Sequence, residues 1–592
     1  MEWTHESRSE DVVEDFIGRC WALCSSLLLF GSTMLTAAPV PDAGTLLRDV
    51  EQSPRQEQRQ EIPEIQVQQP GAVTGTDSTL SLTLAAVEFS GNQSLPSSVL
   101  EDLAAPYLGR PVSFTDLQQL IAEISRYYQQ LGFLTSRAYL PAQEIAAGTL
   151  QIRIIEGQLA ASGFSLNASQ SLRLKQETAL RLLRAAIPEG QVLRKAELER
   201  GLLLLDDLPG VAARSTLVPG ASPGTSELLV DIREDKLLSG SIDVDNYGGR
   251  YSGDLRGGGS VQINNPGRVG DLGGLKLLSS GEGLNYLRGF YQRPVGVHGT
   301  RLGASVSWMD YSLGEEFKDD GIEGNSQVYG LSLTHPIIRG RDLNLNFSSS
   351  YDHKRLVDDV AGVTTRKRVI DVMAFSLSGD LTDHLYNFGV TAFSTTLTAG
   401  QLDLSGVPGA LAVDQATAET DGSYGLLRGS VSHTRYLSNR FSLYAALQGQ
   451  LPFGNLDSSE KLSLGGAASV RAYPHGEANG DAGYLLNAEV RYDLNDLLPN
   501  HQLQTCLFVD HGHIWLHKDP WAGWQGSNPA LENNYGLSGA GIGVLLSRTG
   551  CYYVRASYGW ALGNNKGRDA NGKDSEGRNP AGQFWLQASY WF

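Results

Sequence analysis

The chain has 592 residues, of which 65 are acidic and 47 basic, so its formal net charge is −18. This balance disfavours a nucleic-acid-binding protein, because such proteins normally present a basic face. Glycine is enriched, at 68 residues, without the three-residue period of collagen. After residue 38 no run of about 18 apolar residues occurs, which excludes a protein that crosses a membrane with several helices but not one that crosses with strands.

The first segment, residues 1–38, is predicted to be a signal peptide. Its apolar stretch runs from Cys20 to Ala38 and ends in small residues, as a cleavage site requires. The residues before this stretch are unusually acidic, so either the leader is long or the true start codon lies downstream. An uncleaved anchor helix is the alternative.

Two short segments follow the leader. Residues 43–51 (AGTLLRDVE) have the spacing of one short amphipathic helix. Residues 52–80 are rich in Gln, Pro, Glu and Gly and contain almost no large apolar side chain. This composition predicts a flexible linker.

Residues 81–159 and 160–235 repeat one order of predicted elements: strand, helix, helix, strand, strand. In the first segment, Ser113 begins a helix whose apolar residues recur every three or four positions, and Gly132 ends it. The repetition indicates two copies of one α+β domain.

From residue 236 to residue 592 the helical period disappears. About sixteen segments follow, each near ten residues long and apolar at every second position, as in transmembrane barrels. The predicted fold is an all-β transmembrane barrel of about 16 antiparallel strands, preceded by two α+β domains. A large soluble β-sandwich or propeller is the alternative. An even strand number places both ends of the barrel in the periplasm.

The last segment combines an apolar face, suited to outer-membrane lipid, with Gln587 and Ser589 on the opposite face. It ends on an aromatic residue, Phe592. Outer-membrane barrels present such a terminus to the barrel assembly machinery for insertion.

No catalytic, metal or cofactor site is predicted. The histidines are scattered, and none lies beside a serine and a carboxylate in one motif, so a lipase in the barrel wall has no signature. His511 and His513 share one strand face with Val509 and Trp515. This face is expected to point outward, which favours packing at the membrane interface over a metal pair.

The strongest group of motif residues lies in a long connection between two strand segments, roughly residues 452–483. These residues are Gly465, Gly466, Val470, Arg471 and Tyr473. About forty residues after Arg471, one strand carries Phe508, Asp510 and Gly512. The alternation along this strand directs the Asp510 side chain into the lumen.

The Val470-Arg471-x-Tyr473 segment resembles the tip of the sixth loop in the BamA-type outer-membrane superfamily, and Phe508-x-Asp510-x-Gly512 resembles its partner motif. The resemblance implies that the loop folds back into the barrel and that the Arg471 guanidinium binds the Asp510 carboxylate. The chain departs from the family at Ala472, where glycine is usual. If that backbone needs a positive φ, alanine costs about 1 kcal/mol there.

Residues 127–157 and 198–211 resemble the first and second POTRA domains of two-partner secretion transporters, the TpsB family of haemolysin and filamentous-haemagglutinin exporters. The resemblance implies a monomeric bacterial outer-membrane protein with both POTRA domains in the periplasm and residues 39–51 as a plug helix in the pore. The implied partner is an unfolded, secreted, TpsA-like β-helical protein. No enzymatic activity, cofactor or nucleic-acid partner is implied.

Two other classes of outer-membrane protein are alternatives to a secretion transporter. An assembly or insertion factor for outer-membrane proteins would use the same two folds. A passive channel needs no POTRA domains, and the paired repeats argue against it.

Overall fold

The computed structural model describes residues 40–51, 65–67, 81–145, 147–168, 172–281, 283–495, 497–526, 529, 531–569 and 571–592. The predicted signal peptide and most of the predicted linker therefore lie outside the described residues. Among the residues that are described, no helix is both long and apolar enough to cross a membrane.

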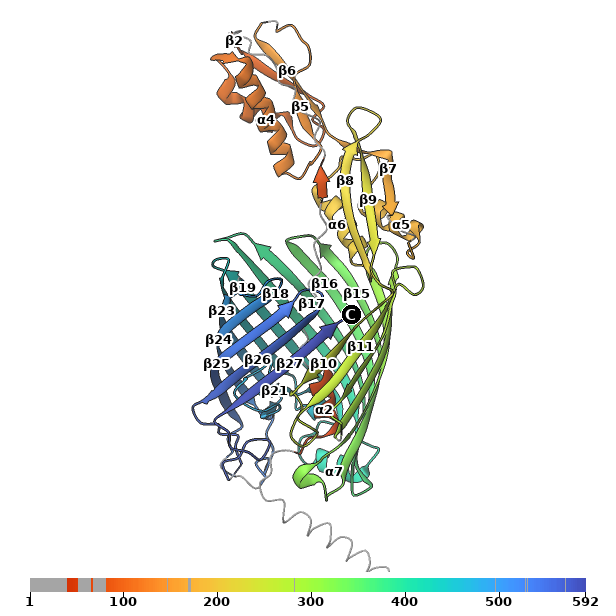
Figure 1. Ribbon diagram of the computed structural model, residues 1–592, viewed down its shortest axis with the longest axis vertical. Coiled ribbons are helices and arrows are strands. Elements are labelled where there is room, and N and C mark those ends of the chain that lie inside the picture. The colour runs from red at the N-terminus through yellow and green to blue at the C-terminus, as the bar shows by residue number, and fades with distance from the viewer. Residues whose placement is uncertain are drawn as a thin grey trace, which may run out of the picture.

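Sixteen antiparallel strands close into a barrel, because the last strand, β27, pairs with the first, β10 (Figure 1). This confirms the predicted barrel and its even strand number. The strands are β10 (Leu238–Asp245), β11 (Arg256–Asn264), β12 (Leu272–Ser279), β13 (Leu284–Val295), β14 (Thr300–Ser312), β15 (Ile322–Arg339), β16 (Leu343–Val360), β17 (Val363–Asp383), β18 (Phe388–Asp403), β19 (Gly422–Tyr436), β20 (Phe441–Pro452), β23 (Ala482–Asp493), β24 (Gln502–Trp515), β25 (Asn534–Arg548), β26 (Tyr552–Leu562) and β27 (Gly582–Trp591).

The two faces of the barrel wall differ, as the alternation of side chains predicts. On β27, Phe584, Leu586 and Tyr590 are exposed on the outer face, whereas Trp585 and Gln587 are buried on the inner face. Outward apolar side chains in every second position are buried by lipid in a membrane. The wall therefore presents apolar side chains outward and a mixture of polar and apolar side chains inward.

The first of two α/β modules occupies residues 81–155. Its three-stranded sheet, in the order β3–β6–β5, packs on helix α4, and β2 pairs with β4 beside it. Helix α4 begins at a capping box, in which the Ser113 hydroxyl accepts the Asp116 amide and the Asp116 carboxylate accepts the Ser113 amide. The elements are β2 (Ser81–Thr83), β3 (Ala86–Ser90), α3 (Ser97–Ala104), β4 (Pro111–Ser113), α4 (Phe114–Gln130), β5 (Arg137–Tyr139) and β6 (Thr149–Ile155).

Apart from the short strands β2 and β4 of the first module, the second module has the same order of strand, helix, helix, strand, strand. Its elements are β7 (Gln158–Ala168), α5 (Gln176–Ala186), α6 (Lys195–Asp206), β8 (Val211–Pro219) and β9 (Thr225–Glu234). An additional strand, β1 (Ile65–Val67), pairs in parallel with β8 at the edge of the sheet. This strand lies within the segment predicted to be a linker, where three residues are too few to show a period.

The second module is fixed to one rim of the barrel. Arg339 Nη2 and Nε donate to the Asp207 carboxylate at 2.7 and 2.9 Å, and Arg341 Nε lies 3.2 Å from Glu199 Oε1. The first module contacts the second. For example, the Lys195 amide of the second module donates to the Gly132 carbonyl of the first at 2.8 Å. Among the described residues, no hydrogen bond or ion pair joins the first module to the barrel. Figure 1 shows the modules stacked above the rim at which the chain ends.

Candidate functional site

A long connection between β20 and β23, residues 453–481, folds back into the barrel. It forms a small sheet of its own from β21 (Leu462–Leu464) and β22 (Ala478–Gly480). Between these strands, Val470 and Tyr473 are buried in an apolar cluster with residues of β23, β24 and β25. We call this segment the inward loop.

Arg471, at the tip of the inward loop, binds two strands of the wall. Its Nε and Nη2 donate to the two carboxylate oxygens of Asp510 at 2.9 and 2.8 Å, and its Nη1 donates to Glu489 Oε1 at 2.6 Å. The guanidinium carbon lies 3.5 Å from the centroid of the Phe508 ring. Asp510 is fully buried and also accepts from Asn487 Nδ2 at 2.7 Å. This geometry is bidentate and largely desolvated, which strengthens each contact.

The glycines of the motif allow the loop to turn and to approach the wall. Gly465 and Gly466 have φ values of +95° and +102°, a region that side chains strongly disfavour. A Cβ at Gly512 would lie 2.7 Å from Leu464 Cδ2, so glycine makes room for the loop there. Ala472 is not among the described residues with a positive φ. The strain considered for alanine at this position is therefore absent.

A nine-residue helix, α2 (Ala43–Glu51), lies inside the barrel (Figure 1). Its apolar face comprises Ala43, Leu46, Leu47 and Val50, which pack against buried residues on β12 to β18 of the wall. A helix of this length is marginal in water by itself. Its packing against the wall, and its polar contacts with the inward loop, hold it in place.

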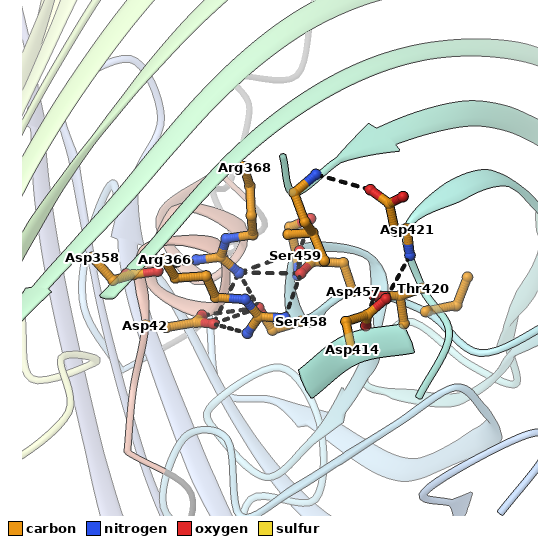
Figure 2. Close-up of polar contacts among 12 residues, drawn as sticks. Asp42, Asp358, Arg366, Arg368, Asp414, Thr420, Asp421, Asp457, Ser458 and Ser459 are labelled. Atoms are coloured by element: carbon orange, nitrogen blue, oxygen red, sulfur yellow. Dashed lines mark hydrogen bonds and ion pairs between the residues drawn. The ribbon is translucent and has the colours of Figure 1, made fainter. Parts of the chain in front are cut away.

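Arg368 on β17 is the centre of a buried ion cluster at the start of α2 (Figure 2). Its Nη1 donates to Asp42 at 2.9 Å and to Asp457 at 3.2 Å, and its Nη2 donates to Asp358 at 2.6 Å. Asp42 precedes α2, Asp358 lies on β16 and Asp457 lies in the inward loop. One fully buried guanidinium therefore joins the helix, the wall and the loop.

Further contacts reinforce this cluster. The Ala43 amide donates to Asp358 Oδ1 at 2.8 Å, and the Ser458 hydroxyl donates to Asp42 at 2.7 Å. Arg366, two residues before Arg368, is more distant, at 3.7 Å from Asp42 and 3.5 Å from Asp457. Arg368 is thus the principal cation of the cluster.

The other polar face of α2 contacts the inward loop. Arg48 Nη1 donates to two loop carbonyls at 3.1 and 3.0 Å, and its Nη2 donates to Asn479 Oδ1 at 2.8 Å. Asp49 Oδ1 lies 3.3 Å from His475 Nε2. Burial raises the pKa of Asp49, but His475 and Arg48 outweigh burial and hold this pKa at about 2. The Asp49 carboxylate is therefore charged at neutral pH.

A cavity of about 510 Å³ lies beside α2. Residues of α2, the inward loop and the connections between β10 and β11 and between β24 and β25 line it.

The described residues include no group of three or more His, Cys, Asp or Glu that could hold a metal ion. On the outer face, the rings of His513 and Tyr484 stack with their centroids 5.9 Å apart. Together, α2 and the inward loop occupy the lumen and are held there by ion pairs.

Two protein-family models match the chain. The family model described as haemolysin secretion/activation protein ShlB/FhaC/HecB matches residues 224–546, more than half of the chain. The chain belongs to this family. A second model, the ShlB-type POTRA domain, matches residues 82–157, which correspond to the first module.

Individual relatives agree with this assignment. The heme/hemopexin transporter protein HuxB of Haemophilus influenzae is 29% identical, over 94% of this chain and 95% of the relative. The outer membrane transporter CdiB of Dickeya dadantii is 24% identical, over 74% of this chain and 77% of the relative. The solved structure of CdiB from Escherichia coli has the same fold, with a TM-score of 0.67 and 22% identity, covering 88% of this chain and 93% of that one.

Membership of the haemolysin secretion/activation family settles the class of activity. The chain is an outer-membrane transporter of two-partner secretion and not an enzyme. Its barrel lies in the outer membrane, and its POTRA domain lies in the periplasm. The soluble β-sandwich or propeller is therefore excluded.

Sequence reasoning missed several residues of the site. Glu489 and Asn487 share the inward face of β23 and lie beside Asp510 on β24, so the alternation along β23 could have indicated them. Arg368 has no motif of its own. Its partners Asp42 and Asp457 come from segments more than 400 residues apart in the sequence, and no local period connects them.

Proposed function

We propose that this transporter exports a large secreted partner through its barrel, that α2 is a plug helix closing the lumen at rest, and that the second module is a second POTRA domain. The observation that carries the proposal is the ion cluster of Arg368, which holds α2 to both the wall and the inward loop. The repeated element order supports the assignment of the second module.

The first module offers an edge on which an unfolded partner can be held. At one side of its sheet, the Gln143 amide side chain donates to and accepts from the backbone of Gln151 on β6, both at 2.7 Å, beyond the short strand β5. These bonds occupy the backbone of Gln151, next to the residues of β6 that pair with β5. At the other side the sheet ends on β3. An extended segment of the partner can add to such an edge by main-chain hydrogen bonds.

Export requires that α2 leave the lumen while the barrel wall stays closed. In this proposal the Arg368 cluster holds the plug helix at rest, and the Arg471–Asp510 contact keeps the inward loop in its functional position. The sequence contains no G-x-x-x-x-G-K-[ST] segment for a nucleotide. Folding of the partner outside the cell then gives the direction of transport.

The remaining features of the proposal follow from the resemblance. The partner is a TpsA-like protein of the β-helical type. The transporter acts as a monomer in outer-membrane lipid, and the barrel assembly machinery inserts it through the strand that ends at Phe592.

The test compares the culture supernatants of the native host with and without this gene. Loss of one or two large secreted proteins, with other outer-membrane proteins unchanged, is the expected result. A general fall in barrel proteins with an unchanged supernatant would instead identify an assembly factor. No change in either, under conditions in which the gene is expressed, would favour a passive channel.

A further inference from the structure

The outward faces of β16 and β17 change from apolar to polar at one level. The connection before β16 contacts the second module, so the turn between β16 and β17 lies on the side away from the periplasm. From Leu343 to Tyr351, a length that crosses the hydrocarbon of a bilayer, the outward side chains of β16 are apolar except for Ser349. Met373 lies opposite Tyr351, and Leu381 lies opposite Leu343. The outer boundary of the membrane therefore lies at Tyr351 and Met373.

Beyond this boundary, a group of polar side chains lies on the outward face. This group, which we call the outer polar group, comprises His353, Arg355, Lys367 and Asp371. The register of the two strands places His353 opposite Asp371. It places Lys367 diagonally next to Arg355. The intervening Lys354 and Arg368 point into the lumen instead, where they bind carboxylates of the inward loop.

A chain of hydrogen bonds fixes the Arg355 guanidinium. Its Nε donates to His353 Nε2 at 3.1 Å. Since a guanidinium can only donate, His353 is protonated on Nδ1 and donates from there to Asp371 Oδ1 at 2.8 Å. The Tyr351 hydroxyl donates to the same oxygen at 2.6 Å. Because His353 is two residues nearer to the membrane, the chain turns the guanidinium back toward the lipid surface.

Two cationic groups of the outer polar group are open to an anion. Within the described part of the chain, no hydrogen bond or ion pair engages Arg355 Nη1, Arg355 Nη2 or Lys367 Nζ, and both side chains are exposed. The carboxylate of the group, that of Asp371, is already bound by Tyr351 and His353. A planar guanidinium with its Nη atoms free matches two oxygens of a phosphate.

We infer that the outer polar group binds the phosphate of a lipid headgroup in the outer leaflet, with Arg355 as the bidentate donor and Lys367 as a second cation. The apolar face directly below, from Tyr351 and Met373 toward the periplasm, would contact the acyl chains of the same lipid. This continuity favours a lipid over a free anion. The inference is independent of the proposed plug and of the secreted partner.

The height of Arg355 fits a headgroup. It lies four residues beyond Tyr351, about 13 Å along the strand, and the tilt of a barrel strand reduces this to roughly 10 Å above the hydrocarbon. The headgroup layer is about 5–7 Å thick on each side of a bilayer. The arginine side chain, turned back toward the membrane, spans the remaining distance.

The test titrates the full-length transporter, purified in a mild detergent, with bisphosphorylated lipid A. Native mass spectrometry measures the bound lipid. We expect saturable binding that is lost when the same lipid lacks both phosphates, and that inorganic phosphate at equal concentration does not displace. Equal binding of the dephosphorylated lipid would overturn the inference. Displacement by equal inorganic phosphate would show a site for free anions and would overturn the assignment to a lipid.

Substitution of Arg355 tests the bidentate contact. Arg355→Ala should lower the affinity for bisphosphorylated lipid A roughly tenfold or more, because a hydrogen-bonded contact to a charged group is lost. Arg355→Lys should restore only part of it, since an ammonium is a point charge without the planar fork. Lys367→Ala should have a smaller effect than Arg355→Ala. Wild-type affinity in Arg355→Ala would overturn the inference.

Two further variants separate the geometry of the site from net charge. His353→Ala keeps both cations but releases the guanidinium, so affinity should fall less than in Arg355→Ala; wild-type affinity would contradict the aligning role of His353. Lys318→Ala removes one exposed cation from the outer connection between β14 and β15 and should bind as the wild type does. A loss equal to that of Arg355→Ala would show a response to net charge and overturn the inference. Heat-modifiable mobility on gels checks that each barrel is folded.

Discussion

Two buried arginines hold the contents of the lumen in different ways. Arg471 binds Asp510 and Glu489, which lie on the neighbouring strands β24 and β23, so it attaches the inward loop to a rigid part of the wall. Arg368 binds three carboxylates from three segments, one of which is Asp42, directly before helix α2. The first contact joins the loop to the wall alone, whereas the second also holds the short helix that we propose to be the plug.

In the proposed function, Arg471 therefore positions the inward loop, whereas Arg368 controls whether α2 closes the lumen. Both guanidiniums are largely desolvated, and removal of one partner from a buried ion pair costs about 3–5 kcal/mol because the other charge stays buried without compensation. At Arg471 that cost falls on the position of the inward loop. At Arg368, if α2 is the plug that we propose, it falls on the balance between the plugged and the open lumen.

The largest effect is expected for Arg471→Ala. Loss of the guanidinium leaves Asp510 and Glu489 without their shared cation, so the tip of the inward loop should detach and secretion should fall to the level of the deletion strain. The amount of heat-modifiable barrel in the outer membrane should stay close to that of the wild type. Immunoblots of supernatant and membrane fractions measure both.

Arg435→Ala is the matched control for this variant. Arg435 pairs with Asp383 on the wall at 2.7 Å, and both side chains are partly exposed, so its removal should cost at most about 1 kcal/mol and leave secretion intact. Undiminished secretion from Arg471→Ala would refute the positioning role.

Arg368→Ala is expected to open the lumen without abolishing secretion. If the cluster loses about 3 kcal/mol, the ratio of plugged to open transporter falls roughly 100-fold, since 1.4 kcal/mol corresponds to a factor of ten. Conductance of the purified transporter in planar bilayers should rise, as should the sensitivity of cells to large antibiotics. Arg366→Ala, on the same strand but farther from both carboxylates, should have a much smaller effect. Equal conductance of the two variants would contradict the central place of Arg368.

Asp42→Asn tests the same cluster from the side of the helix. The Asp42 side chain is 20% exposed, so loss of its charge should cost about 1.5 kcal/mol and shift the plugged-to-open ratio roughly tenfold. In the double variant with Arg368→Ala the two effects should not add, because both remove one contact. Simple addition of the two effects on conductance would indicate that Asp42 and Arg368 act separately.

The smallest effect concerns pH at the outer end of the inward loop. Burial raises the pKa of Glu477 to about 7, above its ordinary value of 4.5. Its carboxyl accepts the Ser575 amide at 2.8 Å and so joins the inward loop to the loop between β26 and β27. Because the folded pKa is the higher one, this contribution to stability is fully present below pH 4.5 and is lost as the pH rises through about 7.

The outer loop should therefore become more sensitive to trypsin between pH 5 and pH 8, as measured on isolated membranes. Glu477→Gln should flatten this profile relative to the wild type under identical conditions. A wild-type profile as flat as that of the variant would show that Glu477 does not titrate in this range.

Much of the architecture could be predicted because local rules determine it. The alternation of apolar residues specifies strands with one lipid-facing side, and Ser113 with Asp116 specifies the start of α4. The spacing of Arg471 and Asp510 within known motifs singles out both residues. The Arg368 cluster could not be predicted in this way, because Asp42 and Asp457 come from segments far in sequence from the hairpin that carries Asp358 and Arg368. Strand β1 was missed for a different reason, since its pairing depends on an edge that only the folded second module provides.

Strand β1 also sets the length of a tether. Between Glu51 at the end of α2 and Ile65 at the start of β1 there are 13 residues, whose reach is at most about 45 Å. If α2 is the plug that we propose, its travel out of the lumen is limited to this length for as long as β1 stays paired with β8. The pairing of three residues in the second module would then set the distance over which a helix inside the barrel can move.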